Sequence, residues 1–528
     1  MGVMETTRST FSFTDAPGPD RALLGGKGAG LVEMVALGIP VPPGFVITTD
    51  CGRRYLGHEQ LPDGLIAEVD ARIAELEDGS GRRFAADENP LLVSVRSGAP
   101  VSMPGMMDTV LNVGLTAEAV DALARDTGDE RFAVGCWERL LEGFATIVRG
   151  IGRGVIEDAF LDLPPAAGDP VALARARCGV LLHLIEHESG SPFPAPRRQL
   201  VEAIEAVFAS WESPRAKAYR RHTGISDELG TAVVVQRMVF GNHGASSGSG
   251  VAFTRDPSTG ATGAYGDFLF CAQGEDVVSG EHDTLPLSAL GERLPAVGAE
   301  LHRVFATLER HTRDLCDVEF TVDEGSLWIL QTRPGQRSGR AAVRIATALV
   351  DEGLISVDEA LERVTDEQLA AAQAPVFGAE LTPDAVLARG LAASPGGAVG
   401  RAALDPERAC RLRDEGEPVI LVRPTTSPAD LPGVLAAVGV VTGRGGRTSH
   451  AAVVARGLGR PAVCGAGEIV VAADRRSATL GAHTIAEGDL LSVDGDRGVV
   501  AAGAHELAPA QQSDPSLARF LLWKQQRA

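Results

Sequence analysis

The sequence predicts a multidomain protein of mixed α+β and α/β class, in which a large front domain precedes a small second module. The chain has 528 residues, too many for a single hydrophobic core, so roughly two to four domains are expected. Hydrophobic residues make up 44% of the chain and charged residues 23%, which is ordinary for a soluble globular protein. Segments with helical spacing alternate with strand-like segments, and this alternation indicates the mixed class.

The front domain is expected over residues 1–340. Residues 1 to about 110 combine short apolar runs with Gly and Pro, which is typical of strands and loops around a site. From about 116 to 225 the apolar residues recur at helical spacing, as in "DERFAVGCWERLLEGFATIVRGI", which predicts a helical insertion. Strand-like segments return between 229 and 335.

The second module is expected over residues 386–505, after a helical linker at 341–385. Short strands, glycine turns and helices alternate in this module, which indicates an α/β or β/β/α arrangement. The last stretch, 506–528, is too short for a domain and is interpreted as a C-terminal tail.

Charge and cysteine content exclude several classes of function. The net charge is −21 and the pI is near 5.0, which argues against a nucleic-acid partner because phosphate backbones would be repelled. An acidic protein that binds nucleotides must concentrate its basic residues locally and recruit a divalent cation. No apolar run approaches membrane-spanning length, the amino terminus does not resemble a signal peptide, and the seven cysteines form no C-x-x-C pair. A cytoplasmic protein with reduced thiols and no membrane partner is therefore expected.

A single histidine, His450, lies in the stretch "VVTGRGGRTSHAAVVARGLGRPAVCG" at 440–465. Thr448 and Ser449 are good N-cap residues, and Ala451 to Arg456 predict the first turns of a helix that stops at Gly457. His450 would then lie at the helix mouth, where backbone N–H groups have no partner and the helix dipole is positive. A neutral imidazole there can attack a phosphorus atom. The alternative is a histidine that only caps a helix.

The segment "LLGGKGAG" at 23–30 places Lys27 in a glycine-rich loop, before a helix that is expected to begin near Leu31. Glycines allow backbone amides to approach phosphate oxygens, and a lysine supplies a positive charge. The spacing fits neither a Walker A loop nor G-x-G-x-x-G, so a surface turn is the alternative.

A hairpin is predicted for "DVEFTVDEGSLWILQTR". With a turn centred on Gly325, Glu319 faces Gln331 and Asp317 faces Arg333 on one polar side. The other side would form core, with Val318, Phe320, Val322, Trp328 and Leu330. Glu319 and Gln331 can share a Mg²⁺ ion, and Arg333 can bind a phosphate. A solvent-exposed strand face with a salt bridge is the alternative.

Arg96 is expected at the end of a strand in "SVRSGAPVSMPGMMDTV", before a Gly, Met and Pro loop that leads to Asp108. The methionines are more typical of an adaptable core than of a cofactor site.

Two further groups are interpreted as ordinary surface. Glu275 and Asp276 in "QGEDVVSG" lie near a glycine turn. His183 and His187 are one helical turn apart, a spacing that can bind metal, but the motif lacks the glutamate of H-E-x-x-H.

Taken together, the chain resembles the pyruvate phosphate dikinase family over nearly its whole length. The segments "GGKGAGLVEM", "SVRSGAPVSMPGMMDTVLN", "GSGVAFTRDPSTG", "DVEFTVDEGSLWILQTRPGQR" and "GGRTSHAAVVARG" follow the family's order and spacing. Related groups, such as phosphoenolpyruvate synthase, carry a different segment where this chain has "MPGMMDT", so the dikinase branch is favoured.

The resemblance implies an ATP-grasp nucleotide domain and a swivelling phosphohistidine domain. It further implies that ATP phosphates and Mg²⁺ are bound by the residues at the matching positions. These are Lys27, Arg96, Glu319, Gln331 and Arg333. His450 would be the phosphorylated residue, and Thr448 matches a threonine that a regulatory kinase modifies in some members. Arg447 departs from the family, which usually has an apolar residue there.

In the implied reaction, His450 attacks the β-phosphorus of ATP, AMP leaves, and inorganic phosphate then removes the terminal phosphoryl group as pyrophosphate. The sequence after about residue 505 is too short to contain the family's phosphoenolpyruvate/pyruvate barrel. We therefore expect a separate barrel polypeptide, another small-molecule acceptor, or a chain without turnover. A non-catalytic nucleotide-binding derivative of a dikinase also remains open.

Overall fold

The computed structural model describes residues 8–527 apart from 102, 104–105, 162, 164–168, 279–283, 379–380, 428–429, 447–448, 468, 473 and 510–513. It confirms the predicted mixed α+β and α/β class. The chain forms two compact units, Met1–Ala245 with Trp328–Thr332, and Ser246–Leu327 with Arg333–Ala528. The domain boundaries expected from the sequence stay predictions.

The first unit is built on a five-stranded antiparallel sheet of order β1-β2-β5-β3-β4. Its strands are β1 (Thr10–Ser12), β2 (Gly44–Ile47), β3 (Val93–Gly98), β4 (Thr109–Val113) and β5 (Ala232–Arg237). Strand β2 and most of β5 are buried throughout, because helices pack against the sheet.

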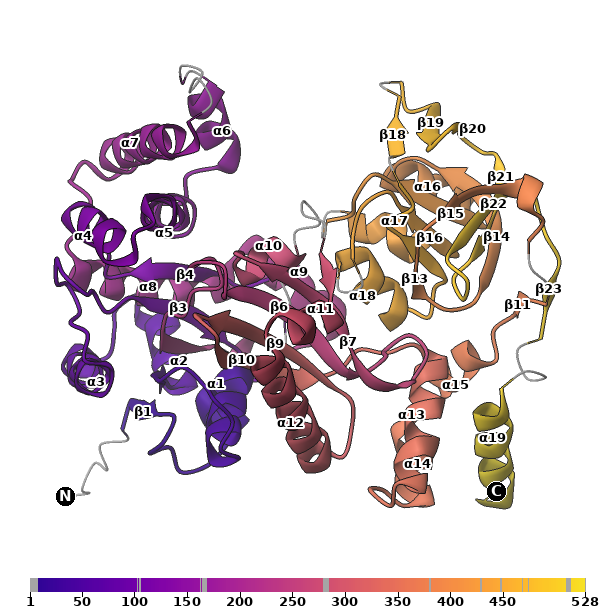
Figure 1. Ribbon diagram of the computed structural model, residues 1–528, viewed down its shortest axis with the longest axis horizontal. Helices are drawn as coiled ribbons and strands as arrows, with labels where there is room; N and C mark the ends of the chain where they lie inside the picture. Colours follow the sequence, from indigo (N-terminus) through magenta and orange to yellow (C-terminus); the bar gives the residue numbers. More distant parts are fainter. Residues whose placement is uncertain are drawn as a thin grey trace. The chain divides into compact units, whose positions relative to one another are not determined.

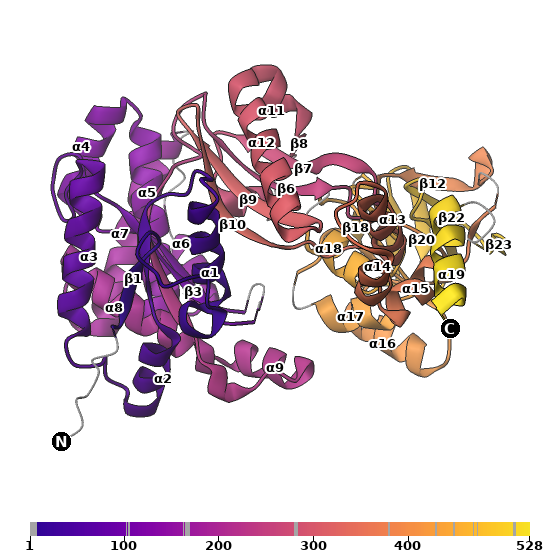
Figure 2. The ribbon, with the colours of Figure 1, turned by 90° about the horizontal axis from the view of Figure 1, so that it is seen from below.

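Nine α-helices accompany this sheet within the described part of the first unit. They are α1 (Arg21–Ala36), α2 (Thr49–His58), α3 (Leu65–Ser80), α4 (Ala117–Thr127), α5 (Glu130–Gly143), α6 (Arg153–Leu161), α7 (Pro170–Ser189), α8 (Pro196–Ala209) and α9 (Pro214–Thr223). A π-helical turn, Phe144–Val148, follows α5. Helices α4, α5, α6 and α7 group together, as Figures 1 and 2 show, and α5 and α8 pack on strand β4.

The expectation that a helix begins near Leu31 is wrong. Helix α1 starts at Arg21, capped by the side chain of Asp20, and is broken only at Gly25, whose φ of 67° and ψ of 167° are not helical. Lys27 therefore lies on a helical turn just after the break. Small residues allow helix and sheet to pack tightly here: a Cβ on Gly28 would lie 2.8 Å from the Val46 side chain. Tertiary packing thus outweighs the low helix propensity of glycine.

A second five-stranded sheet has the order β10-β9-β6-β7-β8 and belongs to the second unit except for Trp328–Thr332 of β10. Its strands are β6 (Gly248–Arg255), β7 (Thr262–Phe270), β8 (Leu285–Pro286), β9 (Cys316–Asp323) and β10 (Ser326–Pro334), with helices α10 (Gly274–Val278), α11 (Ser288–Arg293) and α12 (Pro295–Thr312) between them.

The predicted hairpin is formed by β9 and β10, but part of its predicted core is wrong. The turn contains two residues, Glu324 and Gly325, with φ of 47° and 77°. Such a two-residue turn shifts the facing pairs by one position from those of a turn centred on Gly325, so the prediction that Glu319 faces Gln331 and that Asp317 faces Arg333 is wrong. Leu327 and Ile329 are accordingly buried, whereas Trp328 and Leu330 are only half-buried.

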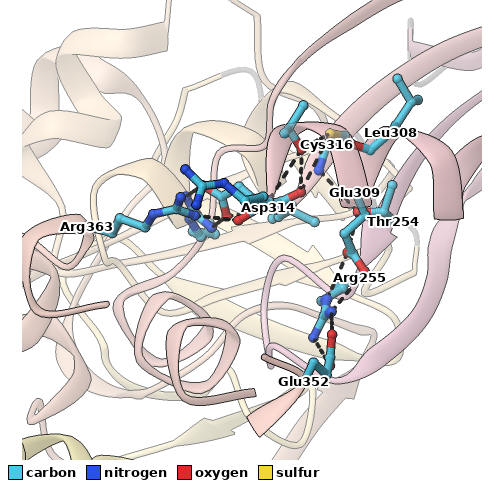
Figure 3. A network of polar contacts seen from close by, with 12 residues as sticks. Thr254, Arg255, Leu308, Glu309, Asp314, Cys316, Glu352 and Arg363 are labelled. Atoms are coloured by element: carbon cyan, nitrogen blue, oxygen red, sulfur yellow. Dashed lines mark hydrogen bonds and ion pairs between the residues drawn. The ribbon is translucent and has the colours of Figure 1, made fainter. Parts of the chain in front are cut away.

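Helices α13 (Gly339–Asp351), α14 (Val357–Arg363) and α15 (Asp366–Ala372) follow this sheet, and α19 (Pro515–Arg527) packs against α13 and α14. Figure 1 shows α13, α14 and α19 side by side. A polar network, shown in Figure 3, ties α13 to the sheet: the Arg255 guanidinium donates to Glu309 of α12 and to Glu352 at the end of α13, with N–O distances of 2.6–3.0 Å. Because Arg255 is buried, both carboxylates are needed to offset the desolvation of its charge.

The rest of the second unit is a module around an eight-stranded mixed sheet of order β12-β22-β21-β14-β15-β16-β17-β13. Its strands are β12 (Val386–Arg389), β13 (Leu391–Ser394), β14 (Gly397–Ala403), β15 (Val419–Arg423), β16 (Gly439–Thr442), β17 (Ala462–Cys464), β21 (Leu490–Asp494) and β22 (Val499–Ala502). Strands β14 to β17 are parallel, and helices α16 (Pro406–Asp414), α17 (Leu431–Ala436) and α18 (His450–Gly457) connect them.

Two small antiparallel sheets complete the fold. One contains β18 (Ile469–Val471), β19 (Ser477–Leu480) and β20 (His483–Ala486), and the other pairs β11 (Val376–Phe377) with β23 (Leu507–Ala508). All seven cysteines are free thiols, as the absence of C-x-x-C pairs predicts. Within the described part of the chain, every helix is too short or too polar to cross a membrane.

Candidate active site

His450 is the first residue of helix α18, after the glycine-rich loop that follows strand β16. Ser449 is the N-cap residue, with φ −60° and ψ 157°, but its side chain makes no capping hydrogen bond. Ala451, Ala452 and Ala455 are buried, and α18 packs on β13, β16 and β17. The predicted helix is confirmed, and His450 lies where the helix dipole is positive and the backbone N–H groups have no intrahelical acceptor.

The imidazole of His450 is half-buried, and its Nδ1 lies 3.4 Å from the hydroxyl oxygen of Thr426. Burial lowers the pKa of His450 from its ordinary value of 6.5, although the nearby Asp430 carboxylate acts in the opposite direction. The neutral form is therefore favoured near pH 7. With Nδ1 close to Thr426, Nε2 is the ring nitrogen that can act as a nucleophile.

Gly445 is a position in the loop before His450 that favours glycine. Gly445 has a φ of 121°, and a Cβ there would lie 2.9 Å from the Ser449 hydroxyl oxygen. Thr448, the candidate regulatory threonine, and Arg447 lie outside the described residues, so their predicted roles stay predictions.

A second group of predicted residues lies on the β9–β10 hairpin. The guanidinium Nε of Arg333 donates to Asp317 Oδ2 at 2.7 Å, and Arg333 Nη2 lies 3.6 Å from Glu319 Oε1. Asp317 and Arg333 thus form an ion pair, although the shifted register means that they are not directly facing residues. Burial raises the pKa of Asp317 despite the attraction of Arg333, and the neighbouring Glu319 adds to the increase.

The third group lies in the first unit. Arg96 is on strand β3, on the opposite face from the buried Val93 and Val95. Its Nη1 donates to the side-chain oxygen of Gln236 at 3.5 Å and to the carbonyl of Leu330 at 3.4 Å. Gln331 follows Leu330 on strand β10 and is half-buried.

Lys27 lies beside the same strand end. The Gly26 N–H donates to the carbonyl of Ala99 at 2.8 Å, and the Lys27 Cβ lies 3.4 Å from the place that a Cβ on Gly98 would occupy. The structure thus brings the backbone around Lys27 to the end of the strand that carries Arg96. The close approach depends on glycines, because a Cβ on Gly25 would lie 1.6 Å from the Gly98 carbonyl oxygen.

The predicted residues are therefore distributed over both units. Lys27, Arg96 and Gln331 belong to the first, and Glu319, Arg333 and His450 belong to the second.

Two residues of interest were not among the expected site residues. Asp317 was expected only as the partner of Arg333, yet it is a buried carboxylate beside Glu319. Thr426 lies in "RPTTSPADLPG", where no sequence pattern indicates contact with a histidine 24 residues later.

The two groups interpreted as ordinary surface show no site geometry. His183 and His187 are exposed on α7 with ring centroids 6.3 Å apart, and Asp276 accepts a hydrogen bond from the backbone N–H of Gln273.

Comparison with known protein families gives two matches. The pyruvate phosphate dikinase AMP/ATP-binding domain matches residues 21–71, 53–285 and 296–353. The mobile domain of phosphoenolpyruvate-utilising enzymes matches residues 415–498, which contain His450. Together these matches account for more than half of the chain.

Individual relatives agree with these matches. The chain is 43% identical over 526 residues to pyruvate, phosphate dikinase of Clostridium symbiosum, which covers 97% of this chain and 60% of that protein. It is 44% identical over 518 residues to the enzyme of Rhizobium meliloti, covering 94% and 57%, and 44% identical over 512 residues to chloroplastic pyruvate, phosphate dikinase 1 of Arabidopsis thaliana, covering 95% and 53%. The chain thus spans little more than half the length of these curated relatives. The extent of these matches shows that the chain belongs to the pyruvate phosphate dikinase family of kinases.

Proposed function

We propose that this chain catalyses the ATP- and Mg²⁺-dependent phosphorylation of His450, the first half of a pyruvate phosphate dikinase reaction. The observation that carries the proposal is the state of His450: a half-buried, neutral imidazole at the start of helix α18, with Nδ1 close to Thr426. A neutral imidazole is the nucleophilic form, and the helix N-terminus stabilises the negative charge that the ring acquires.

In the proposed reaction, Nε2 of His450 attacks the β-phosphorus of ATP, and the bond to the α-phosphate oxygen breaks so that AMP leaves. Inorganic phosphate then attacks the terminal phosphorus of the pyrophosphohistidine, and pyrophosphate leaves, with one phosphoryl group remaining on His450. Nδ1–H donates to the Thr426 hydroxyl in the reactive tautomer, which holds the ring and leaves the lone pair of Nε2 available.

Lys27, Arg96 and Arg333 are the proposed contacts for the ATP phosphates. Arg96 supports this role because its guanidinium Nη1 donates to two neutral oxygens, of Gln236 and Leu330, at the long distances of 3.5 and 3.4 Å. Arginine suits phosphates because its planar donors can bind two oxygens at once.

The carboxylates of the β9–β10 hairpin fit a magnesium ion. Asp317 Oδ1 is buried and has no hydrogen-bond partner among the described residues, and Glu319 is its neighbour on the same face. Such hard oxygen donors are what Mg²⁺ prefers, with Gln331 as a further oxygen ligand in the proposal. When bound, Mg²⁺ would neutralise phosphate charge at the reacting oxygens.

The final acceptor in the proposal is pyruvate, bound by a separate barrel polypeptide, and the alternative is another small-molecule acceptor. The names of the relatives, each a pyruvate, phosphate dikinase, support pyruvate as the acceptor. This chain matches 53–60% of the length of those proteins. Incubating the phosphorylated chain with pyruvate alone tests the separate barrel: formation of phosphoenolpyruvate without added protein would contradict it.

The first reaction is tested with ATP labelled separately at the β and γ positions, with Mg²⁺, with and without inorganic phosphate. We expect acid-labile β-label and AMP for the wild type, with pyrophosphate released only when phosphate is present. His450→Ala should acquire no label, whereas His187→Ala, which changes an exposed histidine on α7, should behave as the wild type. Absence of label and of AMP in the wild type would refute the proposal and favour a non-catalytic nucleotide-binding role.

A further inference from the structure

A polar cavity of about 500 Å³ lies in the first unit, along one face of helix α8. Arg198, Glu202 and Glu205 of this helix line it, at the three- and four-residue spacing that places side chains on one helix face. Tyr55 of α2 and Arg149, directly after the π-helical turn, also line it. The volume is within the range of small-molecule sites, and π-helical turns are common at functional sites. We refer to it as the α8 cavity.

Two arginines on the wall of the α8 cavity share one carboxylate. Glu202 accepts from Arg149 Nη2 at 2.8 Å and from Arg198 Nε at 2.6 Å, so its carboxylate is shared by both guanidiniums. Asp108, also on the wall, forms an ion pair with Arg215. Arg149, Arg198 and Glu202 therefore carry one net positive charge together, and Glu205 adds a separate negative charge.

Glu205 is half-buried and makes no hydrogen bond or ion pair with the described part of the chain. Burial raises its pKa, and the neighbouring Glu202 adds to the increase although Arg198 opposes it. Tyr55 is close enough for the Glu205 charge to raise the pKa of its phenol, although burial is the larger cause. Glu205 and Tyr55 both line the cavity, and a half-buried carboxylate without an ion-pair partner in the described part of the chain is suited to a cationic donor.

The guanidiniums suit an anionic group. Arg198 is 70% exposed and uses only Nε for Glu202, so its terminal nitrogens face solvent or a ligand. Arg149 is mostly buried against the ring of Phe144, and its Nε has no hydrogen-bond partner among the described residues. A simple anion would be repelled by Glu205 and a simple cation by the two arginines. A ligand that carries both charges satisfies both sets of groups.

We propose that the α8 cavity binds a small zwitterion, a free α-amino acid, whose ammonium group contacts Glu205 and Tyr55 and whose carboxylate contacts Arg198. Ile147, Val148 and Ala206 supply the apolar part of the wall for the ligand's carbon atoms. The inference does not rest on the proposed function. It concerns binding by the first unit alone and needs neither ATP nor His450.

The test is a screen of the common L-α-amino acids at millimolar concentration against the complete chain, by thermal shift and then by calorimetric titration. We expect at least one amino acid to raise the unfolding temperature, because a ligand that binds only the folded state stabilises it. The decarboxylated amine and the deaminated acid of that amino acid should each bind at least about tenfold more weakly, since each lacks one charge.

Two variants locate the site. Glu205→Gln and Arg198→Gln should each weaken binding about tenfold or more, and Arg198→Gln changes an exposed side chain that carries little risk to folding. Glu188→Gln on α7 and Arg197→Gln, which removes an exposed ion pair between α8 and Asp70 of α3, are matched controls and should bind as the wild type. The proposal is overturned if no amino acid binds, or if binding survives unchanged in both cavity variants.

Discussion

At the scale of single residues, the protonation state of His450 depends on influences that act in opposite directions. Burial disfavours the charged imidazolium, and the helix N-terminus acts in the same direction because it presents positive charge. Asp430 opposes both effects. The lowered pKa favours the neutral ring at pH 7, which is the form that the proposed attack on ATP needs, and the helix N-terminus would stabilise the phosphate that the proposal places there.

This balance predicts a pH dependence. Because the pKa of His450 is below 6.5 in the folded chain, the unfolded chain binds more protons at and below that pH. The contribution of His450 to stability should therefore fall as the pH decreases from 7 through 6.5, and level off below the folded pKa. The acid limb of the labelling reaction should likewise have its midpoint below 6.5.

The measurement is the ¹³C–¹H NMR signal of the His450 ring, assigned as the signal that is missing in His450→Asn. A titration midpoint below 6.5 is expected. A midpoint at or above 6.5 would show that the attraction of Asp430 outweighs burial. The same variant provides the stability control, because the wild type should lose more stability than His450→Asn as the pH falls.

At the scale of elements, the break in α1 positions Lys27. Gly25 lets the helix axis change direction while its backbone touches strand β3, and the turn that follows carries Lys27 beside the strand end of Arg96. With a side chain at position 25, α1 and β3 would have to lie farther apart. The break therefore allows the backbone of α1 at Gly25 to lie close to the backbone of β3 at Gly98.

Gly25→Ala should be strongly destabilising, because the new Cβ meets the Gly98 carbonyl oxygen and the left-handed φ adds strain of about 1–3 kcal/mol. Gly38→Ala is a matched control: Gly38 has a φ of 72°, but nothing lies within 4 Å of its Cβ position, so only strain of about 1 kcal/mol is expected. Urea unfolding of both variants measures the difference. Equal destabilisation would mean that the contact with Gly98 relaxes and does not restrict α1.

At the scale of the whole molecule, sequence patterns predicted the elements that depend on local rules. The helix after Ser449 begins and ends where its N-cap residue and its glycine stop predict. The burial of Leu327 in place of Trp328 depended on the conformation of a two-residue turn. Lys27 lies in a helix because α1 packs against the sheet, and the helix propensities of the glycine-rich segment alone do not predict this. Thr426 follows strand β15 and His450 begins the helix after strand β16. The two residues meet because these strands are parallel neighbours, and no periodic pattern in the sequence indicates this contact.

The distribution of the proposed nucleotide contacts over two units leads to a final prediction. The proposal gives Lys27 and Arg96 of the first unit, and Glu319 and Arg333 of the second, a role in binding MgATP, so added MgATP should stabilise each unit. A ligand at a hundred times its Kd contributes about 2.7 kcal/mol of stability. Hydrogen exchange followed by mass spectrometry, with a non-hydrolysable ATP analogue and Mg²⁺, should show increased protection in peptides of both units.

Two variants test the contacts of each unit. Lys27→Met should reduce the added protection in the first unit, and Glu319→Gln should reduce it in the second, because each removes a proposed contact of that unit. His450→Ala should retain the protection, since the proposal gives His450 a part in the chemistry and none in binding. Protection confined to the first unit, or unaffected by Glu319→Gln, would show that the carboxylates of the β9–β10 hairpin do not take part in nucleotide binding.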